Sequence, residues 1–70
     1  MEKVFIKDSY IKLGQAMKLS GQVSSGVEAK FLIGEGEVSV NGEVCTQRGK
    51  KLVPGDEFTF NGETYLIENS

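Results

Sequence analysis

The chain has 70 residues, 39% hydrophobic and 26% charged, which is typical of one small globular domain and too short for two ordinary ones. It contains no histidine and one cysteine, which excludes an internal disulfide, a zinc site built from these residues and histidine-based catalysis. No apolar run approaches the ~20 residues of a membrane span and no signal-peptide core is present, so we expect a cytoplasmic, non-catalytic single domain without cofactor or metal.

The N-terminal part of the chain predicts one strand followed by one helix. Residues 4–6 are strand formers flanked by lysines, which favours an edge strand. Asp8 or Ser9 can cap a helix. Apolar residues then recur at helical spacing: Leu13, Ala16 and Met17. The helix is expected to end near Gly21, because glycine readily adopts the left-handed conformation that follows a last helical turn.

A second helix is expected to begin after Ser25. Ser25 and Glu28 have the spacing of a capping box, in which each side chain satisfies a free backbone amide. The residues of the expected core-facing stripe are Ala29, Leu32 and Ile33. Gly36 is placed to end the helix. With the short link at 21–24, the two helices form a helical hairpin.

The segment that follows the helices predicts a strand and two tight turns. Val38 and Val40 alternate with polar residues, which gives the strand one apolar face. Asn41-Gly42 favours a type I′ hairpin turn, because both of its central residues need a positive φ. Residues 53–56, Val-Pro-Gly-Asp, fit a type II turn with glycine at the positive-φ position.

The C-terminal part predicts a second hairpin. Phe58 and Phe60 alternate with polar residues, and Asn61-Gly62 turns the chain into the strand formers at 65–67. Residues 68–70 are expected to be frayed. The expected fold class is therefore α+β: a short N-terminal strand, a helix-loop-helix and a small antiparallel sheet with Asn-Gly hairpins.

Charge is unevenly distributed along this acidic chain, whose net charge is −2. Residues 9–27 carry only Lys12 and Lys18, and residues 44–55 carry only cations. The acids are concentrated elsewhere, at Glu35, Glu37, Glu43, Asp56, Glu57, Glu63 and Glu68. This segregation predicts either one basic face on an acidic protein or, as the simpler alternative, ordinary solvated charge.

A set of residues with fixed spacing extends from the second helix into the first hairpin. Its members are Ser25, Ala29, Lys30, Leu32, Ile33, Gly36, Val38, Val40, Asn41 and Gly42. In register, they resemble the core signature of the RNA-binding domain named after the fourth protein of the small ribosomal subunit. Lys12-Leu13 and Met17 resemble the opening of that family's pattern, and residues 53–58 resemble its closing V-x-P-G-D-x-I. The resemblance covers about residues 11–60.

Two positions depart from the family's pattern. Gly26 stands where many members carry arginine, which removes one expected phosphate contact. Gly14 stands where the family usually has aspartate, which changes a contact of the first helix. The chain also resembles short stand-alone bacterial members in its basic loop, residues 46–51.

The resemblance implies a non-catalytic protein that grips structured RNA through the helix pair and this loop. The candidate RNA-binding residues are Lys12, Lys18, Ser25, Lys30, Asn41, Gly42, Arg48, Lys50 and Lys51. The structural alternatives are surface lysines, a helix cap at Ser25 and plain turn chemistry at Asn41-Gly42. Four aromatic residues are expected in the core: Phe31, Phe58, Phe60 and Tyr65. Tyr10 is less constrained, and stacking on a base is an option there.

Two other functions are compatible with a chain of this size. A ubiquitin-like sulfur carrier is disfavoured, because it needs a C-terminal Gly-Gly and this sequence ends Glu-Asn-Ser. A protein-binding adaptor could use the acidic sheet end around Glu35, Glu37 and Glu43. The favoured prediction is a monomeric, ribosome- or translation-associated protein that binds structured RNA. Ribosomal RNA, transfer RNA and a messenger stem are all compatible with this prediction.

Overall fold

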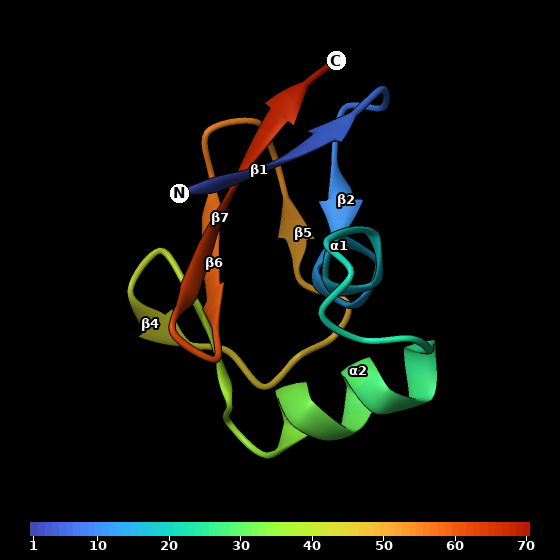
Figure 1. Ribbon diagram of the computed structural model, residues 1–70, viewed down its shortest axis with the longest axis vertical. Helices are drawn as coiled ribbons and strands as arrows, with labels where there is room; N and C mark the ends of the chain where they lie inside the picture. The colour runs from blue at the N-terminus through green and yellow to red at the C-terminus, as the bar shows by residue number, and fades with distance from the viewer.

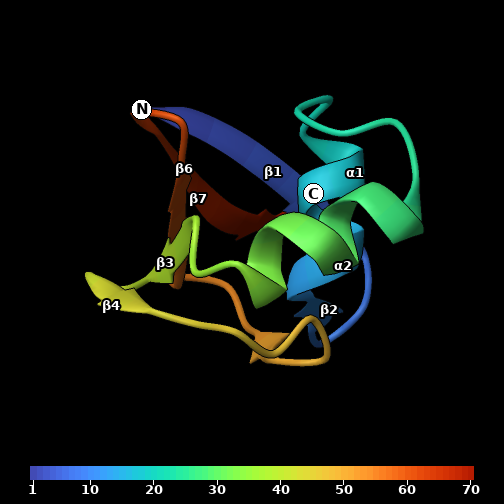
Figure 2. The same ribbon diagram turned by 90° about the horizontal axis from the view of Figure 1, so that it is seen from below.

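The computed structural model describes residues 1–70 and places two helices on one side of a five-stranded sheet (Figures 1 and 2). The strand order in this sheet is β1-β7-β6-β3-β4, and β2 and β5 form a separate two-stranded ribbon. Neither helix is long and apolar enough to cross a membrane. The elements are β1 (Glu2–Ile6), β2 (Ile11–Lys12), α1 (Leu13–Leu19), α2 (Gly26–Gly34), β3 (Val38–Val40), β4 (Glu43–Val44), β5 (Lys51–Leu52), β6 (Glu57–Phe60) and β7 (Glu63–Asn69).

The expected α+β class and element order are confirmed, with β1 as an edge strand. The sheet is mixed rather than wholly antiparallel, because β1 pairs with β7 in parallel. The expected fraying of residues 68–70 is wrong. Glu68 and Asn69 pair with β1, and the Ser70 N–H donates to the carbonyl of Ile6 at 2.9 Å. Lys3 Nζ also lies 3.5 Å from the Glu68 carboxylate, so the chain end is held by a strand far away in sequence.

Helix α1 begins later than its expected caps, Asp8 and Ser9. Residues 11–12 instead form β2, which pairs with β5, and α1 starts at Leu13. The expected cap at Asp8 or Ser9 is therefore wrong. The first free amides of α1 donate to carbonyls in the loop at residues 46–51 and not to the side chain of a preceding residue. The helix ends as expected, with Gly21 at φ +85°.

Local chemistry sets both ends of α2. The Ser25 hydroxyl accepts from the Glu28 N–H at 3.2 Å, which confirms the N-cap. The Glu28 carboxylate reaches one residue further back than expected, to the Ser24 N–H at 2.9 Å. At the other end, Gly36 has φ +80°. Its N–H and that of Glu37 donate back to carbonyls in the last helical turn, which is the Schellman arrangement.

One hydrophobic cluster joins the helices to the sheet. Its residues are Val4, Ile6, Leu13, Ala16, Met17, Val23, Ala29, Ile33, Val38, Val40, Leu52, Phe58, Tyr65 and Ile67. Leu32 and Phe60, expected in this core, are only half-buried against it. The expectation for Phe31 is wrong: its side chain is 65% exposed, because the helical period points it away from Ala29 and Ile33.

The predicted turns are confirmed by their backbone angles. Asn41 and Gly42 have φ of 50° and 86°, and Asn61 and Gly62 have 54° and 79°, as type I′ turns require. Gly55 has φ of 101°, and the Asp56 N–H donates to the Val53 carbonyl at 2.9 Å, as in a type II turn.

Candidate nucleic-acid interface

The basic loop, residues 46–51, is fastened to the start of α1. The Leu13 N–H donates to the Lys50 carbonyl at 2.8 Å, and the Gly14 N–H donates to the Arg48 carbonyl at 3.0 Å. Two amides that a helix start leaves free are thereby satisfied by the loop. A Cβ atom on Gly14 would lie 3.6 Å from Arg48 Cβ, so a side chain at this position would already touch the loop. Figures 1 and 2 both place β5, which begins at the last residue of the loop, beside β2.

A basic hollow of about 280 Å³ lies where the loop, α1 and the start of α2 meet. It is lined by Lys12, Gly14, Gln15, Lys18, Gly26, Arg48 and Gly49. The lining contains three cations and no acid or apolar side chain. Lys12 of β2, Lys18 of α1 and Arg48 of the loop, which are separate in sequence, therefore face one space.

The cations around this hollow lie close to one another, which lowers the stability of the fold. Lys12 lies directly opposite Lys51 in the β2–β5 pair, where like charges are unfavourable. The one ion pair of the protein joins Lys3 to Glu68 in the five-stranded sheet, so none of the hollow's cations is ion-paired. The acid of the two adjoining depressions is Asp8, which does not line the hollow itself. Local arrangements that cost stability are expected at functional sites. This one fits the binding of an anion.

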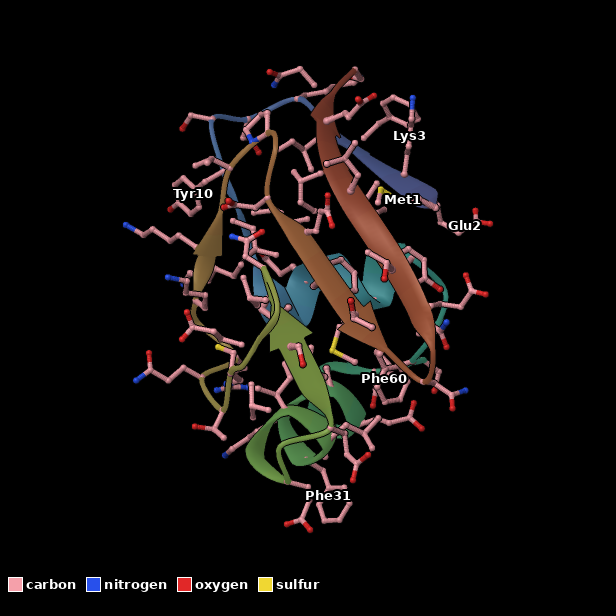
Figure 3. All side chains as sticks on the ribbon, turned by 90° about the vertical axis from the view of Figure 1, so that its left-hand side faces the viewer. Met1, Glu2, Lys3, Tyr10, Phe31 and Phe60 are labelled. Atoms are coloured by element: carbon pink, nitrogen blue, oxygen red, sulfur yellow. The ribbon has the colours of Figure 1, made fainter.

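Three further candidates adjoin the hollow. Ser25 precedes Gly26, and its hydroxyl serves as the cap of α2. Lys30 is exposed one helical turn after Gly26, and it therefore extends the same face of α2. Lys51 carries its ammonium 4.9 Å from the centre of the Tyr10 ring. Figure 3 shows Tyr10 beside the ribbon of β5 and well apart from Lys3.

The remaining candidates lie elsewhere. The Asn41 amide donates to the Asp56 carboxylate at 3.2 Å, and its oxygen accepts from the Glu57 N–H at 2.9 Å. This side chain therefore joins two turns, and Gly42 completes the first of them. Lys50 lines a separate depression that also includes Asn41. The structure does not bring these three residues into the basic hollow.

Sequence reasoning missed one residue of the hollow, Gln15. Gln15 lies three residues after Lys12 and three before Lys18, so helical spacing could have found it. Gly49 belongs to the basic loop, where a glycine is expected to let the backbone approach a phosphate closely, and it lines the hollow. Gly14 and Gly26, noted as departures from a family pattern, both line the hollow.

Asn41 is expected to be a structural residue. Asn41→Ala should lower the free energy of unfolding by about 2–3 kcal/mol, because it removes two hydrogen bonds and forces alanine into the left-handed region. Asn41→Gly keeps the backbone conformation and should cost only about 1–2 kcal/mol. Urea unfolding measures both losses. Unchanged stability of Asn41→Gly together with weakened RNA binding would contradict this role and indicate a direct RNA contact.

Comparison with known proteins places these features in context. The family model described as "S4 domain" matches residues 4–68. The chain is 38% identical over 61 residues to "Putative RNA-binding protein YbcJ" of Escherichia coli strain K12, covering 87% of each chain. It is 41% identical over 59 residues to "Probable ribosome maturation protein RlbA" of Bacillus subtilis strain 168, covering 84% of this chain and 83% of that protein.

A solved structure is similar over nearly the whole chain. The solution structure of YbcJ from E. coli has a TM-score of 0.73 and 33% identity, and the match covers 97% of this chain and 87% of that one. That structure is described as revealing an αL motif involved in RNA binding.

Proposed function

Because the chain belongs to the S4 domain family, we propose that it binds structured RNA through the basic hollow and the basic loop, without catalysing a reaction. The relative from E. coli is named as an RNA-binding protein, and its solved structure is described by a motif involved in RNA binding. These names support RNA as the partner of this chain. The proposal adds which surface holds the RNA.

The observation that carries the proposal is the convergence of Lys12, Lys18 and Arg48 on one space without an acid. Phosphate contacts supply most of the sequence-independent affinity for nucleic acids, and lysine and arginine are their usual donors. Arg48 adds a planar fork that matches a phosphate with two parallel hydrogen bonds. The convergence explains how a protein with net charge −2 presents a local anion site.

The glycines of the hollow support the same proposal. Nothing lies within 4 Å of a Cβ atom built on Gly26 or Gly49, so neither glycine is required by crowding inside the protein. Without side chains there, an RNA backbone can approach the start of α2 and the loop closely. Gly26 is also the first residue of α2, so the N-terminus of this helix, which favours negative charge, lies at the hollow.

We further propose that the RNA belongs to the translation apparatus. The relative from B. subtilis is named for ribosome maturation, which makes ribosomal RNA the first substrate to test. A monomer in the bacterial cytoplasm fits this role. The sulfur-carrier and adaptor alternatives have no comparable support, because neither uses a cationic hollow.

A salt titration of the unmodified protein tests the proposed function. If about four cations contact phosphates, log affinity for a structured ribosomal RNA fragment should fall against log salt with a slope near −3, at ~0.7–0.9 per contact. Filter binding or fluorescence anisotropy provides the affinities. A slope near zero, or no binding at low salt, would contradict RNA binding through this basic surface.

A further inference from the structure

A larger hollow adjoins the basic one between the end of β1, the following loop and the side of α1. Its volume is about 670 Å³, within the ~300–1,000 Å³ range of small-ligand sites. We call it the apolar groove, and its main walls are Phe5, Tyr10, Ile11 and Leu19. Phe5 is 53% exposed, Leu19 59% and Tyr10 39%, so large apolar side chains face solvent here. Such surfaces mark interaction sites when they are grouped.

The apolar groove is continuous with the basic hollow. Gln15 and Lys18 line both. Tyr10 forms part of the groove, and its ring lies against the ammonium of Lys51 from the basic loop. An RNA strand whose phosphates occupy the basic hollow would therefore bring its adjacent nucleotides to the apolar groove.

The charges of the groove restrict what can occupy it. Lys7 and Lys18 line it together with a single acid, Asp8, and Lys51 stands against Tyr10. The occupant should bring negative charge as well as a flat apolar surface. An unpaired nucleotide has both, since a base stacks on aromatic side chains while its phosphate attracts lysine. The Gln15 amide and the Asp8 carboxylate offer hydrogen bonds to the edge of a base.

We propose that the apolar groove accepts an unpaired base of the RNA whose phosphates occupy the basic hollow. This inference rests on the proposed function and adds that the RNA is a helix with a bulged or looped nucleotide. A fully paired stem keeps its bases stacked and cannot fill the groove. The protein would therefore distinguish an interrupted stem from a continuous one.

The test compares two RNA hairpins with the same stem, one fully paired and one with a single bulged 2-aminopurine. The unmodified protein should bind the bulged hairpin about tenfold more tightly, and its binding should quench the 2-aminopurine fluorescence through stacking. Phe5→Ser with Leu19→Ser removes two exposed walls of the groove without touching the basic loop, and it should abolish both the preference and the quenching. Affinity for the paired hairpin should change less than twofold.

The matched control is Val27→Ser with Phe31→Ser. It also converts one exposed aliphatic and one exposed aromatic side chain to serine, but on the outer side of α2, where Figure 3 shows Phe31 well apart from Tyr10. This variant should keep the preference. Equal affinity of the unmodified protein for the two hairpins would overturn the groove and leave the proposed function intact. Binding to neither hairpin would overturn both. If both variants lost the preference for the bulged hairpin, the proposal that the apolar groove binds the unpaired base would also be wrong.

Discussion

Replacing Lys12, Lys18 and Arg48 together by glutamine should flatten the salt dependence of RNA affinity by about two units, because each lost phosphate contact removes ~0.7–0.9 from the slope. With the expected slope near −3, the unmodified protein should lose affinity by about sixty-fold between about 50 and about 200 mM salt. The variant, with a slope near −1, should lose only about fourfold over the same range. Affinities for one structured RNA at four or more salt concentrations give both slopes.

The control must change net charge equally, because any loss of positive charge weakens non-specific attraction. Lys3→Glu with Asn61→Asp also lowers the net charge by three, two from the first change and one from the second. Lys3 lies in β1 and Asn61 in the β6–β7 turn, and neither lines the basic hollow. Aspartate tolerates the positive φ of Asn61. Both variants are first shown to be folded by circular dichroism. Equal slopes for the two would mean that the protein has no localised basic face.

Features that depend on a few neighbouring residues could be predicted from the sequence. Asn41-Gly42 and Asn61-Gly62 form type I′ turns because few other residue pairs accept two positive φ angles in succession. The Ser25 hydroxyl caps α2 because the amide three residues later has no other partner. In each case the favourable interaction lies within four residues, so the local sequence contains all of its parts.

Features that depend on distant partners could not be predicted in this way. The start of α1 is set by the carbonyls of Arg48 and Lys50, more than thirty residues away. Residues 68–70 are ordered because β1 offers them a parallel partner from the other end of the chain. Two-residue strands such as β2 have no periodicity to detect. Phe31 is exposed although aromatic residues are usually buried. Its position on the helix, not its residue type, determines its exposure, because it lies on the side of α2 that faces away from the core.

The candidate site likewise combines features that the sequence could predict with features that depend on distant contacts. The resemblance to a family pattern identified Lys12, Lys18 and the basic loop from their place in the sequence. It could not show that they meet, because their convergence follows from the two hydrogen bonds between α1 and the loop. The same pattern includes Asn41, whose side chain joins two turns instead of facing the hollow. Residues of one motif can therefore lie apart in the structure, some joining turns and others lining the proposed binding surface.

Phe58→Ala should be the most destabilising single truncation of the sheet. Phe58 is fully buried and lies opposite both Val40 and Tyr65 in neighbouring strands. Its ring stacks on Tyr65 at 4.9 Å between centres and 15° between planes. The Tyr65 hydroxyl in turn accepts a hydrogen bond from Gln22 in the link between the helices. Loss of the ring would therefore leave a cavity and loosen the contact between sheet and helical hairpin.

Truncation of a buried phenylalanine costs about 3–5 kcal/mol. A domain of this size rarely has more than about 5 kcal/mol in total, so Phe58→Ala should be largely unfolded at room temperature. Phe60→Ala is the matched control, because it makes the same change on the same face of β6 at a half-buried position. The free energy of unfolding of the control should fall by only about 1–2 kcal/mol, because the Phe60 side chain buries less apolar area on folding than Phe58 does. Urea unfolding of both variants measures the difference, and equal losses would show that the core is not centred on Phe58.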